Sequence, residues 1–387
     1  MKIAITGIRG IPARYGGFET CAEETAVRFA REHEVIVYCR RHNSDHADSK
    51  FKGVNLIKLR SIHSKHFDTL SHTFLSILKI IADPGIQIVH VYNAVNSIFI
   101  PILRAFGKKV VVSVDGLEWK RRKWGKLARA FHKVSERICT RTADKIIADS
   151  TVVRDYYARE YNVKTEYIPY GGQVDSDADP GQLSEYGLTP RRYFLFVGRL
   201  VPEKGVHNLI AAYNKTDINM PLVIVGDDSS HEKYQKSLKE MATDRVRFLG
   251  FVYGRGYQAI NKFPYVYVTS SMLEGTSPAL VSAMGAGNCV LVNGIEENLA
   301  TIGDAGLWYS ENNTAELAEK LTILANNPAK VEEYRQKAYR HGQDNYNWDS
   351  IADQYISLFK NLLGEPESAD HRCMEVSEGK RTLESIS

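Results

Sequence analysis

The chain has 387 residues, of which 43% are hydrophobic, 25% charged and 10% aromatic. This composition is that of a folded globular protein long enough for two domains, and it excludes a single small binding module and a chain that is disordered throughout. Lys and Arg number 50 against 46 Asp and Glu, so the net charge of +4 gives no support to a nucleic-acid-binding protein.

Short β-branched runs alternate with helix-length amphipathic segments along the chain. In the first half, strands are predicted at residues 2–6, 34–38, 54–59, 87–91, 109–114 and 145–148. From Tyr193 the pattern restarts, with strands predicted at residues 193–197, 222–225, 246–249, 265–268 and 290–292. This βαβ alternation predicts an α/β protein made of two doubly wound, Rossmann-like domains.

A glycine-rich, acidic segment without apolar periodicity follows Tyr170 and is typical of an interdomain linker. We place the first domain at residues 1–172 and the second at residues 173–347. An amphipathic helix is predicted within residues 348–364 and is expected to pack back on the first domain. Residues 365–387 are charged and poor in large apolar side chains, so a disordered tail is expected there.

The five cysteines, which are far apart and form no CxxC pair, are Cys21, Cys39, Cys139, Cys289 and Cys373. They indicate neither a disulfide framework nor a zinc site, which favours a reducing compartment. The first residues lack the pattern of a secretory signal, and no apolar run reaches the roughly 18 residues of a membrane span. We therefore expect a cytoplasmic protein.

Glycines follow the first predicted strand, and Gly16 and Gly17 directly precede a helix predicted near Phe18. Backbone amides at such a helix start bind phosphate groups; a tight turn that needs positive φ is the alternative. The spacing is neither GxGxxG nor GxxxxGK[ST], which disfavours dinucleotide-binding and P-loop proteins.

Arg199 and Lys204 follow the first strand of the second domain, at the sheet edge where open α/β folds bind ligands. Their charges suit a diphosphate, and a solvated loop is the alternative. Further along, Ser277 and Pro278 are good first residues of a helix, so nearby amides are expected to open toward the same crevice. Glu274 either accepts hydrogen bonds from sugar hydroxyls or complements the helix dipole.

Together these motifs resemble glycosyltransferase family 4, whose members are retaining enzymes with GT-B architecture, two Rossmann-like domains facing across a cleft. The resemblance covers nearly the whole ordered chain and rests on Gly16-Gly17, Gly198-Arg199-Leu200 with Glu203-Lys204-Gly205, and Glu274 with Ala283-Met284-Gly285. The segment from Gly7 to Glu19 and the segment that begins Asp115-Gly116-Leu117-Glu118 look closest to a bacterial rhamnosyltransferase-like subgroup of cell-surface polysaccharide assembly.

The resemblance implies that the second domain holds a nucleoside-diphosphate sugar and the first domain the acceptor. It implies catalytic roles for Arg199, Lys204, Glu274 and Asp115. It implies donor binding by Gly16, Gly17, Arg199, Lys204, Glu274, Gly275, Thr276, Ser277 and Ser282. It implies acceptor binding by Arg14, Tyr15 and Trp119. No cofactor is implied, because the nucleotide sugar is a substrate.

Two positions depart from the family pattern. Ser282 stands where the family carries a second carboxylate that contacts ribose, and a deoxyribose donor such as dTDP-rhamnose would lose less from its absence. Asp115 stands where many relatives carry a histidine, and its alternative roles are acceptor positioning, sugar contact and strand-end structure.

Asp175 and Asp177 form a DxD pattern, which binds metal in another glycosyltransferase architecture, but here it lies in the predicted linker. An EF-hand would need glycine where Pro180 stands. No metal site is predicted.

Between Glu118 and Arg141 the sequence carries nine Lys and Arg on a predicted helix that also contains Leu127, Phe131 and Val134. A basic face with apolar anchors suits an anionic membrane surface, and a solvated helix packed through its apolar side is the alternative. The lipid-linked acceptor that the resemblance implies favours peripheral membrane contact over nucleic acid.

The predicted function is that of a retaining hexosyltransferase in polysaccharide biosynthesis. It would move a sugar, with rhamnose preferred, from a nucleoside-diphosphate donor to a saccharide or lipid-linked saccharide. A nucleotide-sugar epimerase of the same architecture and a non-catalytic nucleotide-sugar-binding protein are the alternatives.

Overall fold

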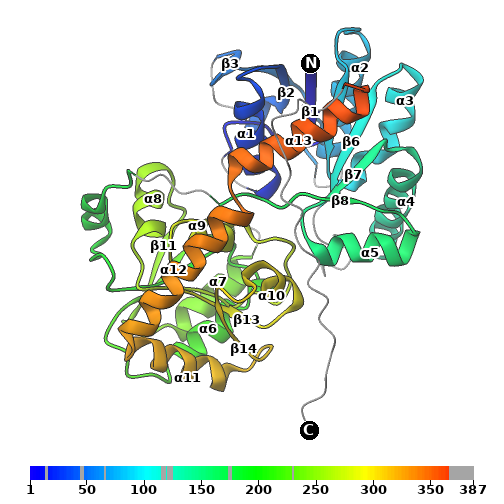
Figure 1. Ribbon diagram of the computed structural model, residues 1–387. Helices are drawn as coiled ribbons and strands as arrows, with labels where there is room; N and C mark the ends of the chain where they lie inside the picture. The colour runs from blue at the N-terminus through cyan, green and yellow to red at the C-terminus, as the bar shows by residue number, and fades with distance from the viewer. Residues whose placement is uncertain are drawn as a thin grey trace, which may run out of the picture.

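The computed structural model describes residues 1–13, 16–43, 48–64, 67–114, 119, 125–172, 177–228 and 231–365. It contains two α/β domains, each built around one mainly parallel sheet, which confirms the predicted fold class (Figure 1). The chain passes from the first domain to the second after residue 172, and the helix α13 (Trp348–Leu363) lies back beside α1 (Gly17–Phe29) in the first.

The first sheet has the strand order β3-β4-β2-β1-β5-β6-β7-β8. All neighbouring strands pair in parallel except β3 and β4. The strands are β1 (Lys2–Thr6), β2 (Glu34–Arg40), β3 (Lys50–Phe51), β4 (Val54–Leu59), β5 (Ile88–Tyr92), β6 (Lys109–Val114), β7 (Lys145–Ala148) and β8 (Glu166–Tyr167). The other helices of this domain are α2 (Asp68–Ile81), η2 (Ala94–Phe99), α3 (Ile100–Ala105), α4 (Lys126–Thr142) and α5 (Thr151–Tyr161).

The second sheet is parallel throughout, in the order β11-β10-β9-β12-β13-β14. Its strands are β9 (Phe194–Val197), β10 (Leu222–Val225), β11 (Val246–Gly250), β12 (Val266–Thr269), β13 (Val290–Asn293) and β14 (Leu307–Tyr309). The helices around it are η4 (Pro180–Tyr186), η5 (Pro202–Lys204), α6 (Val206–Tyr213), α7 (Glu232–Met241), α8 (Gly254–Lys262), α9 (Pro278–Gly285), α10 (Glu296–Ile302), α11 (Thr314–Ala325) and α12 (Pro328–Asn345).

The core of the first domain includes side chains from the end of the chain. Trp348, Ile351, Tyr355 and Phe359 of α13 are buried in the same cluster as the β1 and α1 side chains. The rings of Tyr355 and Phe359 lie 6.1 and 5.8 Å from the ring of Phe29, measured between centroids. Apolar burial against α1 therefore ties the C-terminal helix to the first domain.

Strand order places the carboxyl-end loops where doubly wound folds bind ligands. β1 lies between β2 and β5, and β9 lies between β10 and β12, so each sheet has a point where the winding reverses. A crevice forms outside the carboxyl ends of strands at such a point. The loops that follow β1, β9 and β12 therefore flank the candidate site.

The helix expected from residue 118 is shorter than predicted. Gly125 is extended, with φ −71° and ψ 172°, and α4 begins at Lys126. The side chains of Leu127, Phe131 and Val134 are 89%, 37% and 54% exposed, so these three apolar side chains are not buried against the described part of the domain. The buried positions of α4 are instead His132, Ser135, Glu136 and Cys139, on the face that meets the rest of the domain.

Candidate active site

Lys204 and Glu274 come from the loops that follow β9 and β12, the two strands at the winding reversal. Lys204 Nζ donates a hydrogen bond to Glu274 Oε1 and forms an ion pair with it. Their side chains are 17% and 10% exposed, so this charge pair is largely withdrawn from water. The structure thus brings the predicted diphosphate cation and the predicted sugar-contacting acid together.

Backbone contacts hold these two loops against each other. Ser270 Oγ donates to the carbonyl oxygen of Lys204 at 3.0 Å, and the Met272 amide donates to the Glu203 carbonyl at 2.8 Å. Gly205 has φ 62°, and a Cβ there would lie 2.1 Å from the Ser270 carbonyl oxygen. Only glycine fits this approach, which explains the glycine after Lys204.

Arg199 lies at the start of the same loop, directly beyond β9. Its side chain is partly exposed and forms no hydrogen bond or ion pair with any of the described residues. Five N–H donors are thus free to meet an anion beside the Lys204–Glu274 pair.

The glycine loop of the first domain meets the start of α9 from the second. Gly16 has φ 117° and precedes α1, and a Cβ added to Gly17 would lie 3.2 Å from Pro278 and 3.3 Å from the Tyr170 ring. The amino ends of α1 and α9 therefore lie side by side at the domain boundary. The positive dipole ends of both helices favour an anion at this boundary.

Thr276, a predicted donor-binding residue, contacts the first domain. Its amide donates to Asp149 Oδ2 at 3.1 Å, and its hydroxyl donates to the Asp149 carbonyl oxygen. Asp149 follows β7 in the first domain, so Thr276 ties the two domains together. The sequence analysis missed Asp149, although an acid at the carboxyl end of a parallel strand was an available signal.

Ser277 and Ser282 both lie at α9. Ser277 is the residue before the helix, as predicted, but its side chain forms no capping hydrogen bond and is buried. Ser282 is partly exposed within α9, and its carbonyl accepts the Ala286 amide. Gly275 is partly exposed between Glu274 and Thr276.

Several predicted residues lie outside the described residues, namely Arg14, Tyr15, Asp115, Asp175 and the basic run at 120–123. Trp119 is described, and its ring packs 6.2 Å from the Tyr156 ring with Lys133 Nζ 4.4 Å above it. These contacts give Trp119 a packing role between α4 and α5. Among the described residues, no group of His, Cys, Asp and Glu could hold a metal ion.

Comparisons with known proteins agree with this two-domain architecture. Residues 1–173 match the model "Domain of unknown function (DUF1972)", and residues 184–341 match the model "Glycosyl transferases group 1". The fold is GT-B, the two-domain architecture of nucleotide-sugar glycosyltransferases. Residues 184–341, which lie in the second domain, are therefore similar to the glycosyl transferases of group 1.

Relatives are similar at low identity. Spore coat protein SA of Bacillus subtilis is 24% identical, over 93% of this chain and 99% of its own. An uncharacterized glycosyltransferase of Methanocaldococcus jannaschii is 25% identical, over 62% of this chain and 64% of its own, slightly under two thirds of that relative. The D-rhamnosyltransferase WbpZ of Pseudomonas aeruginosa is 28% identical, over 51% of this chain and 54% of its own.

Solved structures share the fold over nearly the whole chain. Sucrose-phosphate synthase from Thermosynechococcus elongatus has a TM-score of 0.79 and 21% identity, over 94% of this chain and 99% of that one. HepE of Anabaena in complex with UDP has a TM-score of 0.76 and 16% identity, over 93% of this chain and 100% of that one.

Proposed function

We propose that the protein is a retaining glycosyltransferase that moves a sugar from a nucleoside diphosphate to a saccharide or lipid-linked saccharide in cell-surface polysaccharide synthesis. The observation that carries this proposal is the partly buried Lys204–Glu274 pair at the winding reversal of the second domain, in the same loop region as Arg199, which has no partner among the described residues. A diphosphate at this position would meet two cationic groups, and the adjoining sugar would meet a carboxylate.

In this reaction the bond between the sugar's anomeric carbon and the diphosphate oxygen breaks. The acceptor oxygen bonds to the same face of that carbon, and the acceptor proton passes to the leaving phosphate. Arg199 and Lys204 stabilise the charge that grows on the diphosphate, which is the main electrostatic demand of the step. Lys204 turns from Glu274 toward phosphate, and Glu274 then accepts hydrogen bonds from the sugar hydroxyls.

A screen of nucleotide sugars against saccharide acceptors tests this function, with the product linkage determined by NMR. Release of nucleoside diphosphate only when acceptor is present supports transfer. Conversion of the donor sugar without an acceptor would indicate an epimerase, and binding without turnover would indicate a sensor.

We also propose that turnover needs no divalent metal, since two cationic side chains can neutralise the diphosphate. Loss of activity with a chelator and its recovery with Mg²⁺ would contradict this.

We propose rhamnose on a dTDP carrier as the donor, which Ser282 and the likeness to a named rhamnosyltransferase support. HepE, whose structure holds UDP, represents the competing choice. Glu in place of Ser282 adds a charged acceptor for ribose hydroxyls, worth about 1.5–3 kcal/mol. Ser282→Glu should therefore tighten UDP- and GDP-sugar binding more than dTDP-sugar binding, and equal changes in donor titrations would refute the ribose argument.

We further propose that α4 rests on an anionic membrane. Leu127, Phe131 and Val134 are exposed on it, and the exposed cations of the same helix are Lys126, Arg129, Lys133, Arg137 and Arg141. α3 contacts α4 and α2 (Figure 1), and both Ile102 of α3 and Phe106, directly after this helix, are exposed. No helix among the described residues is long and apolar enough to span a bilayer, so this contact would be peripheral.

A further inference from the structure

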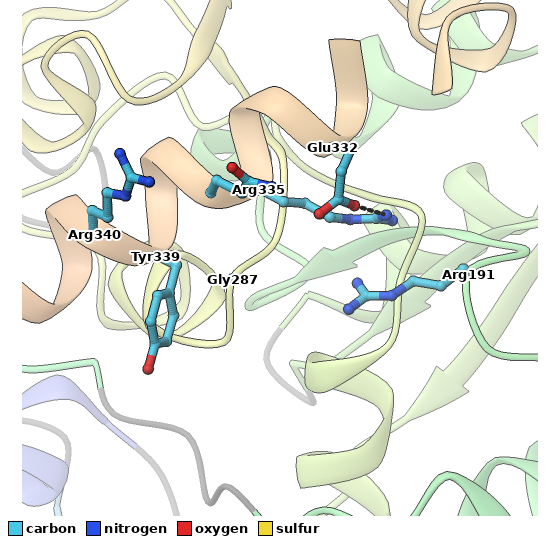
Figure 2. A pocket seen from close by; sticks show the side chains of 7 residues that line it. Arg191, Gly287, Glu332, Arg335, Tyr339 and Arg340 are labelled. Carbon is cyan, nitrogen blue, oxygen red and sulfur yellow. Dashed lines mark hydrogen bonds and ion pairs between the residues drawn. The ribbon is translucent and has the colours of Figure 1, made fainter. Parts of the chain in front are cut away.

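Another charged hollow lies in the second domain, away from the candidate active site. It has a volume of about 410 Å³ and is lined by Arg191, Gly287, Glu332, Arg335, Tyr339 and Arg340 (Figure 2). Arg191 precedes β9 and Gly287 follows α9, so the hollow lies at the amino ends of the strands. Glu274 and Ser277 lie at the opposite end of α9, so donor-binding residues do not line the hollow.

Two guanidinium groups converge on one backbone carbonyl beside this hollow. Arg191 Nη1 donates to the Pro264 carbonyl oxygen at 3.0 Å, and Arg335 Nη2 donates to the same oxygen at 3.2 Å. Glu332 accepts a hydrogen bond from Arg335 Nη1 at 3.3 Å and is the acidic residue among those that line the hollow. Three arginines against one glutamate leave the lining with a surplus of positive charge.

The arginines differ in how many donors the protein already uses. Arg335 donates from Nη1 to Glu332 and from Nη2 to the Pro264 and Tyr265 carbonyl oxygens, so its role is chiefly structural. Arg191 uses Nη1 for Pro264 and Asn288, which leaves Nε and Nη2. Arg340 is exposed and forms no ion pair or hydrogen bond with the described residues.

The backbone at Arg191 is unusual and supports a role for its side chain. Its φ is 60°, in the left-handed region that a non-glycine residue adopts only at a cost. Burial, together with the neighbouring Arg335 charge, lowers the Arg191 pKa to about 10. The backbone strain at Arg191 and the repulsion between the Arg191 and Arg335 charges both cost free energy. Residues held at such a cost are common at binding sites.

We propose that this hollow binds a sugar phosphate. The phosphate would accept hydrogen bonds from the Nε and Nη2 donors of Arg191, and Arg335 would add charge. Arg340, which Figure 2 draws at the other end of the hollow, would turn its guanidinium group toward the same anion. Tyr339 is 48% exposed beside Gly287, so its ring can cover one face of the sugar. Inorganic phosphate would make the arginine contacts but not the Tyr339 contact, so it should bind more weakly than the sugar phosphate.

Calorimetry on the full chain with glucose 6-phosphate and with inorganic phosphate tests this site. Arg340→Ala should weaken binding of both probes about tenfold, equivalent to about 1.4 kcal/mol. Tyr339→Ala should weaken only glucose 6-phosphate, because inorganic phosphate has no ring to stack. Arg159→Ala, an exposed arginine of α5 with the same loss of charge, should leave both affinities unchanged. Arg199→Ala, in the donor loop, is compared to find out whether either probe binds there instead.

Three results would overturn the proposal. Equal affinities in the Arg340→Ala and Arg159→Ala proteins would show that the hollow does not bind phosphate. Loss of all binding in Arg199→Ala would place the anion in the donor loop. Equal loss of both probes in Tyr339→Ala, or of neither, would remove the sugar from the assigned ligand.

Discussion

Arg199 and Lys204 differ in their surroundings, although the sequence places both in one motif. Arg199 is without a partner among the described residues, whereas Lys204 is paired with a buried glutamate. Removing Arg199 takes away only a ligand contact. Removing Lys204 also leaves Glu274 buried without its partner, which costs about 1–3 kcal/mol. The two alanine variants should therefore behave differently.

Arg199→Ala should weaken nucleoside-diphosphate binding by about 1.5–3 kcal/mol and leave the free energy of unfolding within about 0.5 kcal/mol of the native value. Lys204→Ala should lose both donor affinity and stability. Glu274→Gln added to Lys204→Ala should restore stability but not donor affinity. Calorimetry and denaturant unfolding measure the two quantities, and unchanged donor affinity in both alanine variants would remove the motif from the donor site.

His90 provides a pH-dependent term in stability. It lies on β5 with Nε2 2.7 Å from Ser113 Oγ, and burial lowers its pKa from 6.5 to about 3. Between these values the unfolded chain binds a proton that the folded chain does not. The contribution of His90 to the free energy of unfolding is therefore fully present above pH 6.5 and is lost as the pH falls toward 3.

His90→Gln should flatten this dependence, because glutamine can keep a polar contact with Ser113 and does not titrate. From pH 7 to pH 5 the native protein should lose about 2 kcal/mol more unfolding free energy than the variant. His72, whose pKa burial lowers to about 4, remains in both proteins and cancels in the comparison. Parallel stability curves across this range would mean that His90 does not carry the effect.

At the level of elements, the packing of α9 on the linker depends on a glycine. A Cβ at Gly172 would lie 2.2 Å from the Val281 carbonyl oxygen of α9, and the Gly172 amide donates to the Tyr346 carbonyl at 2.9 Å. Gly172 is thus enclosed between α9 and the junction of α12 with α13. Its contacts help to set how the second domain meets the first.

Gly172→Ala should lower the free energy of unfolding by about 1–3 kcal/mol, since the clash is with backbone and cannot relax through a side chain. Gly125→Ala is the matched control: no atom of the described residues lies within 4 Å of the added Cβ, and the extended backbone accepts alanine. Denaturant midpoints compare the two variants. If both unfold at the native midpoint, the contact with Val281 contributes nothing.

The elements show which features the sequence could predict. Strands such as β6 and β10 match their predicted ranges because nearly continuous apolar runs identify buried parallel strands. β3, β8 and β14 were missed, because two or three residues at a sheet edge have no periodicity. The loops after β9 and β12 were located through turn and cap residues. The Lys204–Glu274 pair and the Asp149–Thr276 tie depend on packing between distant segments, which a single sequence does not encode locally.

At the scale of the whole molecule, α4 differs from an ordinary amphipathic helix because it buries polar side chains and exposes apolar ones. Glu136 is buried and accepts hydrogen bonds from Tyr156 at 3.0 Å and Tyr161 at 2.7 Å, and burial raises its pKa. Polar side chains thus face inward, and Leu127 faces water at 89% exposure. Such a face is costly in water and favourable at the boundary between lipid head groups and acyl chains.

Reversing charge at Lys126, Arg129 and Arg137 should weaken binding to phosphatidylglycerol vesicles about a hundredfold, because each basic residue near an anionic surface contributes about 1 kcal/mol. Leu127→Asn with Phe131→Asn should weaken it independently of salt, because this change removes buried apolar area. Reversal at Lys233, Lys236 and Lys239 on α7 makes the same change in net charge on an exposed helix of the other domain and should have little effect. Cosedimentation with the vesicles over a range of salt concentrations compares the three variants. Equal losses of vesicle binding in the α4 and α7 charge reversals would show that the attraction is nonspecific and that α4 is a solvated helix.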